Sequence, residues 1–267
     1  MITIIFGRPG RGKTSLLTHF LIQTYRENGR KLLKFAAQCV TAANRTRTTP
    51  LTVPDAPPIF ANYQVKIKTG YQKYYEPYYL NGFYFGLQNE KMPTQRILPG
   101  GKIFFTEAQR YYNSRKSQTF PEHVINAFAE HRQYYLDIWL DSQRFMNIDK
   151  SIRDLADRFL EVQGMKNVYD KNGWLVRSEF DCREFDYPGD VELYLDGKEK
   201  TWQEVHFTHE GNRFQNFASY GCFDDYLPPD GQDFDCMPYL TMSQVKELSA
   251  AQAVFYNNKE PKEYRGK

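Results

Sequence analysis

The sequence has little cysteine, and this scarcity excludes two classes of protein. Its 267 residues include four cysteines, none in Cys-x-x-Cys spacing: Cys39, Cys182, Cys222 and Cys236. Neither a zinc-ribbon site nor a disulfide-rich secreted scaffold is therefore expected. We predict reduced thiols in a cytoplasmic protein.

The net charge is also small, and long apolar runs are missing. The 35 basic and 32 acidic residues leave a net charge of +3, so any contact with DNA must be local rather than driven by a global field. No stretch reaches the roughly 18 to 20 apolar residues that span a bilayer, and the opening MITIIFGRPG lacks the basic leader of a signal peptide. Aromatic residues, at 16%, are abundant. This composition predicts a soluble, folded globular chain.

A phosphate-binding loop is the strongest motif. The stretch GRPGRGKTS matches G-x-x-x-x-G-K-[ST] and follows the β-branched apolar run of residues 2–6, which predicts a strand. Glycines let successive backbone N–H groups face the phosphates, and the start of the following helix adds a positive dipole. The predicted nucleotide-binding residues are Gly7, Arg8, Pro9, Gly10, Arg11, Gly12, Lys13, Thr14 and Ser15.

The residues after the loop predict a helix. Leu16, Leu17, Phe20, Leu21 and Tyr25 recur at helical spacing, and Gly29 is expected to end the helix. In this arrangement the lysine of the loop reaches the β- and γ-phosphates, and the threonine hydroxyl takes a position on Mg²⁺.

A second motif, KIFFTEAQ, follows at residues 102–109. Ile103 to Phe105 predict a buried strand, and Glu107 comes directly after it, where hydrolytic enzymes keep the base that orients the attacking water. Thr106 precedes it, where many such enzymes have Asp. Two interpretations stay open: a working but slow ATPase, or a nucleotide-binding protein without turnover.

A third motif is the polar end of another predicted strand, Tyr135 to Leu140. Asp141, Ser142 and Gln143 follow this strand directly. Ligands bind at the carboxyl ends of strands in open α/β sheets. We therefore expect Gly7, Glu107 and Gln143 to converge on one nucleotide.

Together, GRPGRGKTS, IFFTEAQRYYNSR and HRQYYLDIWLDSQRFMNIDKSIRDLADRFLEV resemble the zonular occludens toxin (Zot-like) family, the assembly ATPases of filamentous phages. The resemblance covers roughly residues 1–165. It implies an α/β P-loop NTPase fold of the additional-strand, catalytic-glutamate (ASCE) type, related to the FtsK and HerA motors. In that fold a strand carrying a polar sensor lies between the phosphate-loop strand and the catalytic-glutamate strand.

The resemblance also implies roles for individual residues. Gly7 to Thr14 would bind the phosphates of ATP, Glu107 would activate water, and Gln143 would sense the γ-phosphate. Thr14 and Thr106 would serve Mg²⁺. The family usually has Asp where this chain has Thr106, so Thr106→Asp is expected to hold or raise turnover.

The partners implied by the resemblance are those of a phage-assembly motor. We expect a homo-oligomeric ring in the cytoplasm at the inner face of the bacterial inner membrane. It would act with phage coat proteins and inner-membrane assembly proteins, and single-stranded DNA is a further candidate partner. Family members often continue into a transmembrane helix, whereas this sequence ends in the polar NNKEPKEYRGK. Two alternatives remain: a nucleotide-gated scaffold or toxin-like interaction protein, and a small-molecule kinase.

Three regions are expected along the chain: an ATPase core over 1–165, a β-rich extension over 166–240, and a C-terminal helix with a polar tail over 241–267. In the extension, residues 167–186, 190–211 and 213–226 alternate apolar and polar residues around Asn-Gly and Asp-Gly signals, which predicts strands joined in hairpins. His206 and His209 lie on one of these strands, where a structural role is favoured over a metal site. Residues 241–258 predict a helix.

Two further stretches have open interpretations. Residues 41–58 predict an irregular, solvated loop, with a DNA grip through Arg45 and Arg47 as the alternative. Residues 70–86 are rich in aromatics, which would either pack together or stack on nucleic-acid bases. The candidates for an arginine finger are Arg110, Arg115, Arg144 and Arg153.

Overall fold

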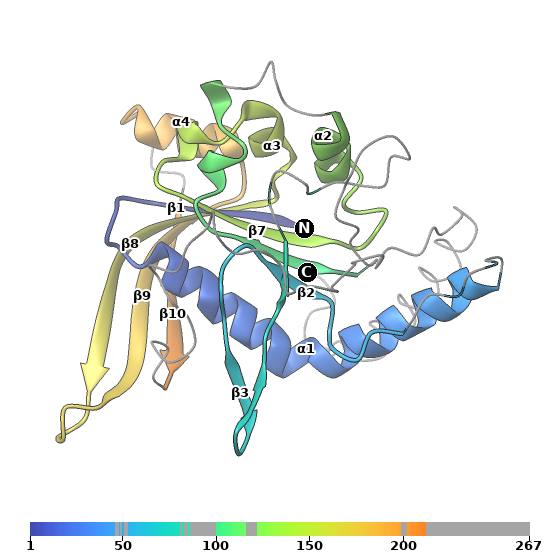
Figure 1. The fold of residues 1–267 in the computed structure, drawn as a ribbon. Helices are drawn as coiled ribbons and strands as arrows, with labels where there is room; N and C mark the ends of the chain where they lie inside the picture. The colour runs from blue at the N-terminus through green and yellow to red at the C-terminus, as the bar shows by residue number, and fades with distance from the viewer. Residues whose placement is uncertain are drawn as a thin grey trace, which may run out of the picture.

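The computed structural model describes residues 1–45, 48, 50, 53–80, 82, 85, 100–115, 122–198 and 202–211. Over these residues the chain forms an eight-stranded sheet with helices on both faces (Figure 1). Its strands are β1 (Ile2–Phe6), β2 (Ile59–Ala61), β5 (Tyr78–Tyr79), β6 (Lys102–Phe105), β7 (Asp137–Ser142), β8 (Arg158–Tyr169), β9 (Leu175–Phe185) and β10 (Gln203–Glu210). The helices are α1 (Lys13–Asn44), α2 (Glu122–Ala129), α3 (Lys150–Leu155) and α4 (Pro188–Leu195).

The strand order identifies the fold. The sheet runs β10-β9-β8-β1-β7-β6-β2-β5, and the strands from β8 to β5 pair in parallel. Strand β7, which carries Asp141, therefore lies between the phosphate-loop strand β1 and the Glu107 strand β6, as predicted. The chain has a P-loop NTPase fold with a catalytic-glutamate strand order. Strand β7 itself begins and ends two residues later than the predicted Tyr135 to Leu140.

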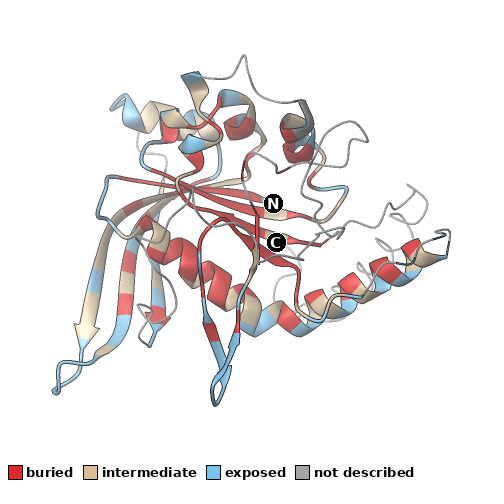
Figure 2. Cartoon of the chain, in the orientation of Figure 1, coloured by how far each residue is buried: buried red, intermediate tan, exposed pale blue. Residues whose placement is uncertain are grey.

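Two apolar cores lie on the two faces of the sheet. In β6, Ile103 and Phe105 pack with α2 and α3, whereas Phe104 packs with α1 and stacks on Trp139 at 4.5 Å. This alternation follows from the pleat of the strand, which turns successive side chains to opposite faces. Because both faces are covered, β1 is buried throughout, and β6 and β7 are buried except at their first residues (Figure 2).

Helix α1 is longer than the sequence predicts, so the expected stop at Gly29 is wrong. Gly29 is buried inside the helix, and a Cβ there would meet the Pro57 ring at 3.4 Å. Beyond it Leu32 and Phe35 continue the buried stripe, and their burial outweighs the cost of a mid-helix glycine. Residues 41–44, expected in a loop, also belong to this helix.

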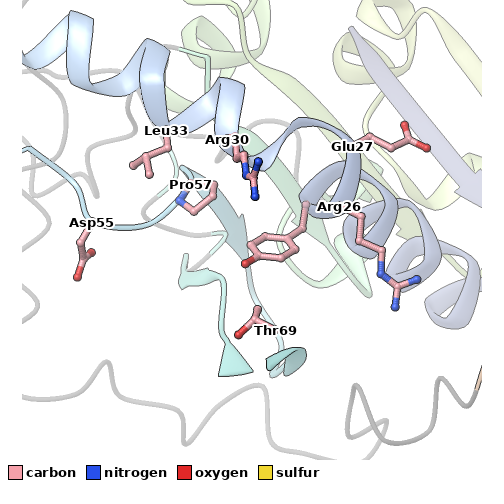
Figure 3. Close-up of a pocket in the computed structure, with 9 residues that line it drawn as sticks. Arg26, Glu27, Arg30, Leu33, Asp55, Pro57 and Thr69 are labelled. Carbon is pink, nitrogen blue, oxygen red and sulfur yellow. The ribbon is translucent and has the colours of Figure 1, made fainter. Parts of the chain in front are cut away.

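The close approach of α1 to Pro57 forms one wall of a surface hollow (Figure 3). Arg26, Arg30 and Asp55 line it. The hollow is not the nucleotide site, because none of the described phosphate-loop residues line it. Its helical residues begin about 18 Å along α1 from Lys13, at 1.5 Å per residue.

The residues after the core extend the same sheet. Strands β8 and β9 form an antiparallel hairpin around Asn172 and Gly173, as predicted, and β10 pairs antiparallel with β9. Residues 190–195, expected as a strand, are instead part of α4, with Pro188 at its first turn and Asp190 favouring the helix N-terminus. Strand β8 runs through the expected boundary at 165, and the division into regions stays a prediction. The predicted hairpin over 213–226 and helix over 241–258 lie outside the described residues.

In the aromatic stretch at 70–86, some of the described tyrosine side chains are buried and others are exposed. Strands β3 (Ile67–Gly70) and β4 (Lys73–Tyr75) form a projecting hairpin (Figure 1). Tyr75 and Tyr79 are buried, whereas Tyr71 and Tyr74 are exposed on the hairpin. Packing therefore accounts for part of this stretch, and stacking on DNA stays untested.

Two expectations about the chain as a whole can be compared with the described residues. Cys39 and Cys182 are free, and both are buried. Over the same residues, every helix lacks either the length or the apolar character needed to cross a bilayer.

Helix α1 meets β10 through a pair of histidines. The Nδ1 atoms of His19 and His209 are 3.1 Å apart, within hydrogen-bond distance. The ring of His19 also packs on Phe20, Phe180 and Phe207. Burial, together with the nearby His209 and Arg26, lowers the pKa of His19 to about 4. These contacts favour a structural role for His209, and within the described residues no cluster of three metal-ligating side chains occurs.

Because the pKa of His19 is lowered in the folded protein, we expect the free energy of unfolding to fall in acid. Unfolded His19 takes up a proton near pH 6.5 but the folded ring only near pH 4, so the stability is complete above pH 6.5 and is lost as the pH falls toward 4. Urea unfolding at pH 7 and pH 4.5 should show about 2 kcal/mol less acid destabilisation in His19→Gln than in the wild type. His206→Gln, at an exposed ring bonded to Asp181, is the control. Equal acid sensitivity of His19→Gln and the wild type would contradict this account.

Candidate functional site

The phosphate loop connects β1 to α1 with three glycines at positive φ. Gly7, Gly10 and Gly12 have φ values of 148°, 78° and 91°, which side chains with a Cβ rarely adopt. A Cβ at Gly7 would also lie 2.8 Å from the carbonyl oxygen of Val162, in β8. The turn therefore favours glycine at all three positions, and at Gly7 the packing on the neighbouring strand also requires it.

Lys13 and Thr14 begin α1 at the end of this loop. The Lys13 side chain is buried, and its Nζ donates to the carbonyl oxygen of Arg8 at 3.3 Å. The ammonium group therefore lies over the loop, as a phosphate-binding lysine must. Arg8 to Arg11 are exposed, and Ser15 is buried in the first turn of the helix.

The hydroxyl of Thr14 meets two side chains from neighbouring strands. Its Oγ1 is 3.1 Å from Thr106 Oγ1, after β6, and donates to Asp141 Oδ2, in β7, at 3.0 Å. Thr106 Oγ1 donates to the same carboxylate oxygen at 2.9 Å. The two predicted metal-site threonines are therefore brought together, with the carboxylate of Asp141 between them.

Asn62 holds Thr106 in place from the other side. Its Oδ1 accepts from the Thr106 N–H at 2.8 Å, and its Nδ2 donates to the Thr106 carbonyl at 2.9 Å. This paired bond fixes the strand end after β6. Asn62 was not predicted from the sequence, although a polar residue directly after the short apolar strand Ile59–Ala61 is the signal that could have found it.

Glu107 and Gln143 converge as the sequence predicts. Gln143 Nε2 donates to Glu107 Oε2 at 3.2 Å, and Gln109 donates to the same oxygen. The backbone of Glu107 has a φ of 51°, uncommon for a residue with a side chain, and its N–H donates to Asp141 Oδ1 at 2.9 Å. The surrounding bonds hold this strained conformation, a common feature of functional sites.

The Asp141 side chain accepts hydrogen bonds from three residues of the site and is fully buried. Both of its oxygens accept hydrogen bonds, Oδ1 from the Glu107 backbone and Oδ2 from Thr14 and Thr106. Burial raises the pKa of the Asp141 carboxyl to about 6, although these hydrogen bonds oppose the shift. The sequence analysis noted Asp141 only as part of a polar strand end.

The donor set suits Mg²⁺. Thr14, Thr106 and Asp141 offer three oxygen ligands within 3.1 Å of one another at the start of α1. Hard cations prefer such oxygen ligands. In P-loop enzymes Mg²⁺ is held by a loop hydroxyl together with an Asp carboxylate, and this chain has both.

The candidate arginine fingers differ in exposure. Arg110, Arg115 and Arg144 are exposed. Arg153 is buried, donates to Glu192 at 2.7 Å and lies over the Phe145 ring. Arg153 is therefore a structural residue.

One family model matches the part of the chain that contains the second and third motifs. The family model described as zonular occludens toxin (Zot) matches residues 85–184, which contain β6, Glu107 and β7. The resemblance to the Zot family is confirmed. No curated protein matches the chain.

Similar solved structures include Zot and packaging proteins. The N-terminal domain of zonular occludens toxin from Neisseria meningitidis has a TM-score of 0.44 and 14% identity, covering 81% of this chain and 98% of that one. The genome packaging NTPase B204 from Sulfolobus turreted icosahedral virus 2, in complex with ATP-gammaS, has a TM-score of 0.36 and 10% identity, covering 79% and 97%.

Proposed function

We propose that this protein is an ATP-hydrolysing motor for filamentous phage assembly and export. One observation carries the proposal: Thr14, Asp141, Glu107 and Gln143 converge at the carboxyl ends of three adjacent strands, beside a phosphate loop. Oxygen ligands, a lysine and a carboxylate held by amides are the parts that ATP hydrolysis needs. A kinase has less support, because the pairing of Glu107 with Gln143 is not a feature that a kinase requires.

Different residues of the site would have different roles in ATP hydrolysis. The N–H groups of the loop and the Lys13 ammonium would bind the β- and γ-phosphates. Glu107 would accept a proton from the attacking water at its carboxylate, while Gln143 and Gln109 hold that carboxylate through Oε2. Gln143 would report the γ-phosphate to Glu107 because the two side chains already touch.

A bound Mg²⁺ ion would neutralise negative charge on the phosphates. Thr14 and the side chains around it would hold the ion. Phosphoryl transfer depends mainly on positioning and electrostatics, so a threonine at 106 does not by itself prevent hydrolysis.

The biological setting rests on the Zot match over residues 85–184. We place the protein in the cytoplasm at the inner face of the bacterial inner membrane, as a ring that acts with coat proteins and inner-membrane assembly proteins. Single-stranded DNA would contact it locally, and the exposed Tyr71 and Tyr74 beside Lys73 offer stacking surfaces.

The second candidate function is a nucleotide-gated scaffold or toxin-like interaction protein without turnover. Thr106 in the place of the family's Asp is the observation that favours it. Such a protein would change its oligomeric state on binding ATP while releasing no phosphate.

Phosphate release separates the two functions. Purified protein should hydrolyse MgATP while it forms oligomers, and addition of single-stranded DNA should raise the rate if DNA is the translocated polymer. An oligomeric protein that binds ATP but releases phosphate only at background would contradict the motor and favour the scaffold.

A further inference from the structure

We propose that Asp141, from the sensor strand β7, is the carboxylate of the Mg²⁺ site, in place of the aspartate that Thr106 replaces on β6. This inference rests on the proposed nucleotide function and deepens it. In this chain the carboxylate lies on the adjacent strand, and the hydroxyl of Thr106 donates a hydrogen bond to it.

The strand register makes this exchange geometrically simple. Strands β6 and β7 are parallel, with Phe105 opposite Leu140. One residue further along, Thr106 and Asp141 are neighbours, and their side chains are joined by the 2.9 Å bond from Thr106 Oγ1 to Asp141 Oδ2. A carboxylate rooted on either strand can therefore reach the same point.

The contacts of Asp141 match those required of a Mg²⁺ carboxylate. Its Oδ2 lies 3.0 Å from the Thr14 hydroxyl, and the P-loop hydroxyl and the Asp carboxylate together hold the ion in this fold. Its Oδ1 accepts from the Glu107 N–H at 2.9 Å, so the same side chain ties the metal site to the proposed base. A buried carboxylate without a cation beside it is costly, and Mg²⁺ bound at Thr14 would compensate this cost.

A purely structural role is the rival explanation. In that case Asp141 would only bind β6 to β7 and fix the strained backbone of Glu107. Its loss would lower stability but would leave the effect of Mg²⁺ on nucleotide binding unchanged. The two explanations therefore differ in a binding measurement that does not require turnover.

The experiment measures the affinity for the non-hydrolysable analogue AMPPCP by calorimetry, with Mg²⁺ and with EDTA. Asp141→Asn keeps the shape of the side chain, and its oxygen can still accept from the Glu107 N–H. We expect the tightening by Mg²⁺ to fall by about 10- to 100-fold, the usual loss for a group that supports a metal, while the affinity in EDTA is kept. Asp137→Asn is the matched control, because this partly buried aspartate lies at the opposite end of β7 and pairs with Lys102.

Two further variants keep the test decisive if Asp141→Asn does not fold. The double variant Thr106→Asp/Asp141→Thr, called the exchange variant, places the carboxylate after β6. It should restore the tightening of AMPPCP binding by Mg²⁺. Thr106→Asp alone should weaken it, because two carboxylates would then face each other across the 2.9 Å contact. This reverses the expectation from the sequence alone.

The outcomes separate the inference from the proposed function. An unchanged Mg²⁺ effect in folded Asp141→Asn, or a gain in Thr106→Asp alone, would overturn the role of Asp141. A folded exchange variant without Mg²⁺ dependence would do the same. Failure of the wild type to bind AMPPCP both with Mg²⁺ and with EDTA would instead overturn the nucleotide function.

Discussion

Glu107→Gln is expected to slow ATP hydrolysis by about 10²- to 10⁴-fold while ATP still binds. The glutamine keeps the length of the side chain, and its oxygen can still accept from Gln143 and Gln109. Its amide cannot accept a proton from water. The bound nucleotide would therefore remain as ATP, and phosphate release in single-turnover experiments is the measurement.

A second result should accompany this loss. Ring motors hold nucleotide between neighbouring subunits, so trapped ATP should shift Glu107→Gln toward higher oligomers, visible by light scattering with ATP and not with ADP. Glu76→Gln is the control, since Glu76 is exposed and pairs with Lys66 on the projecting hairpin. Phosphate release at the wild-type rate in Glu107→Gln would show that another group is the base.

The parts of the site that the sequence predicted are those with local signals. The phosphate loop could be recognised because glycines, lysine and threonine must follow one another between a strand and a helix. Glu107 and Gln143 each follow an apolar strand, and parallel strands bring such ends together. The role of Asp141 was missed because it depends on the register between strands and on hydrogen bonds across them, which no local pattern records. Asn62 was missed although it too directly follows an apolar strand, β2.

The errors in the predicted secondary structure also arise from contacts that a local pattern does not record. Gly29 has the local character of a helix stop, but burial of Leu32 and Phe35 against the sheet carries α1 past it. Residues 190–195 alternate like a strand, yet Pro188 starts a helix there, and the buried Val191 packs it on the core. In both places tertiary burial outweighed local propensity.

Lys13→Ala is expected to weaken ATP binding by at least about 100-fold. The lysine is buried over the loop, and its Nζ lies 3.3 Å from the Arg8 carbonyl, so the charge is held where the β- and γ-phosphates would bind. In the substituted protein the N–H groups of the loop remain, but no point charge balances the phosphates. Titration with a fluorescent ATP analogue measures the change.

The fold should survive this substitution, since alanine is a good helix former at the start of α1. Lys31→Ala, further along the same helix, is the matched control and should leave ATP affinity unchanged. A folded Lys13→Ala protein with wild-type affinity would mean that the loop is not the nucleotide site, and Glu107→Gln would then have no ATP to trap. Loss of binding in Lys13→Ala, together with retained binding in Glu107→Gln, would separate the residue that binds the phosphates from the residue that activates water.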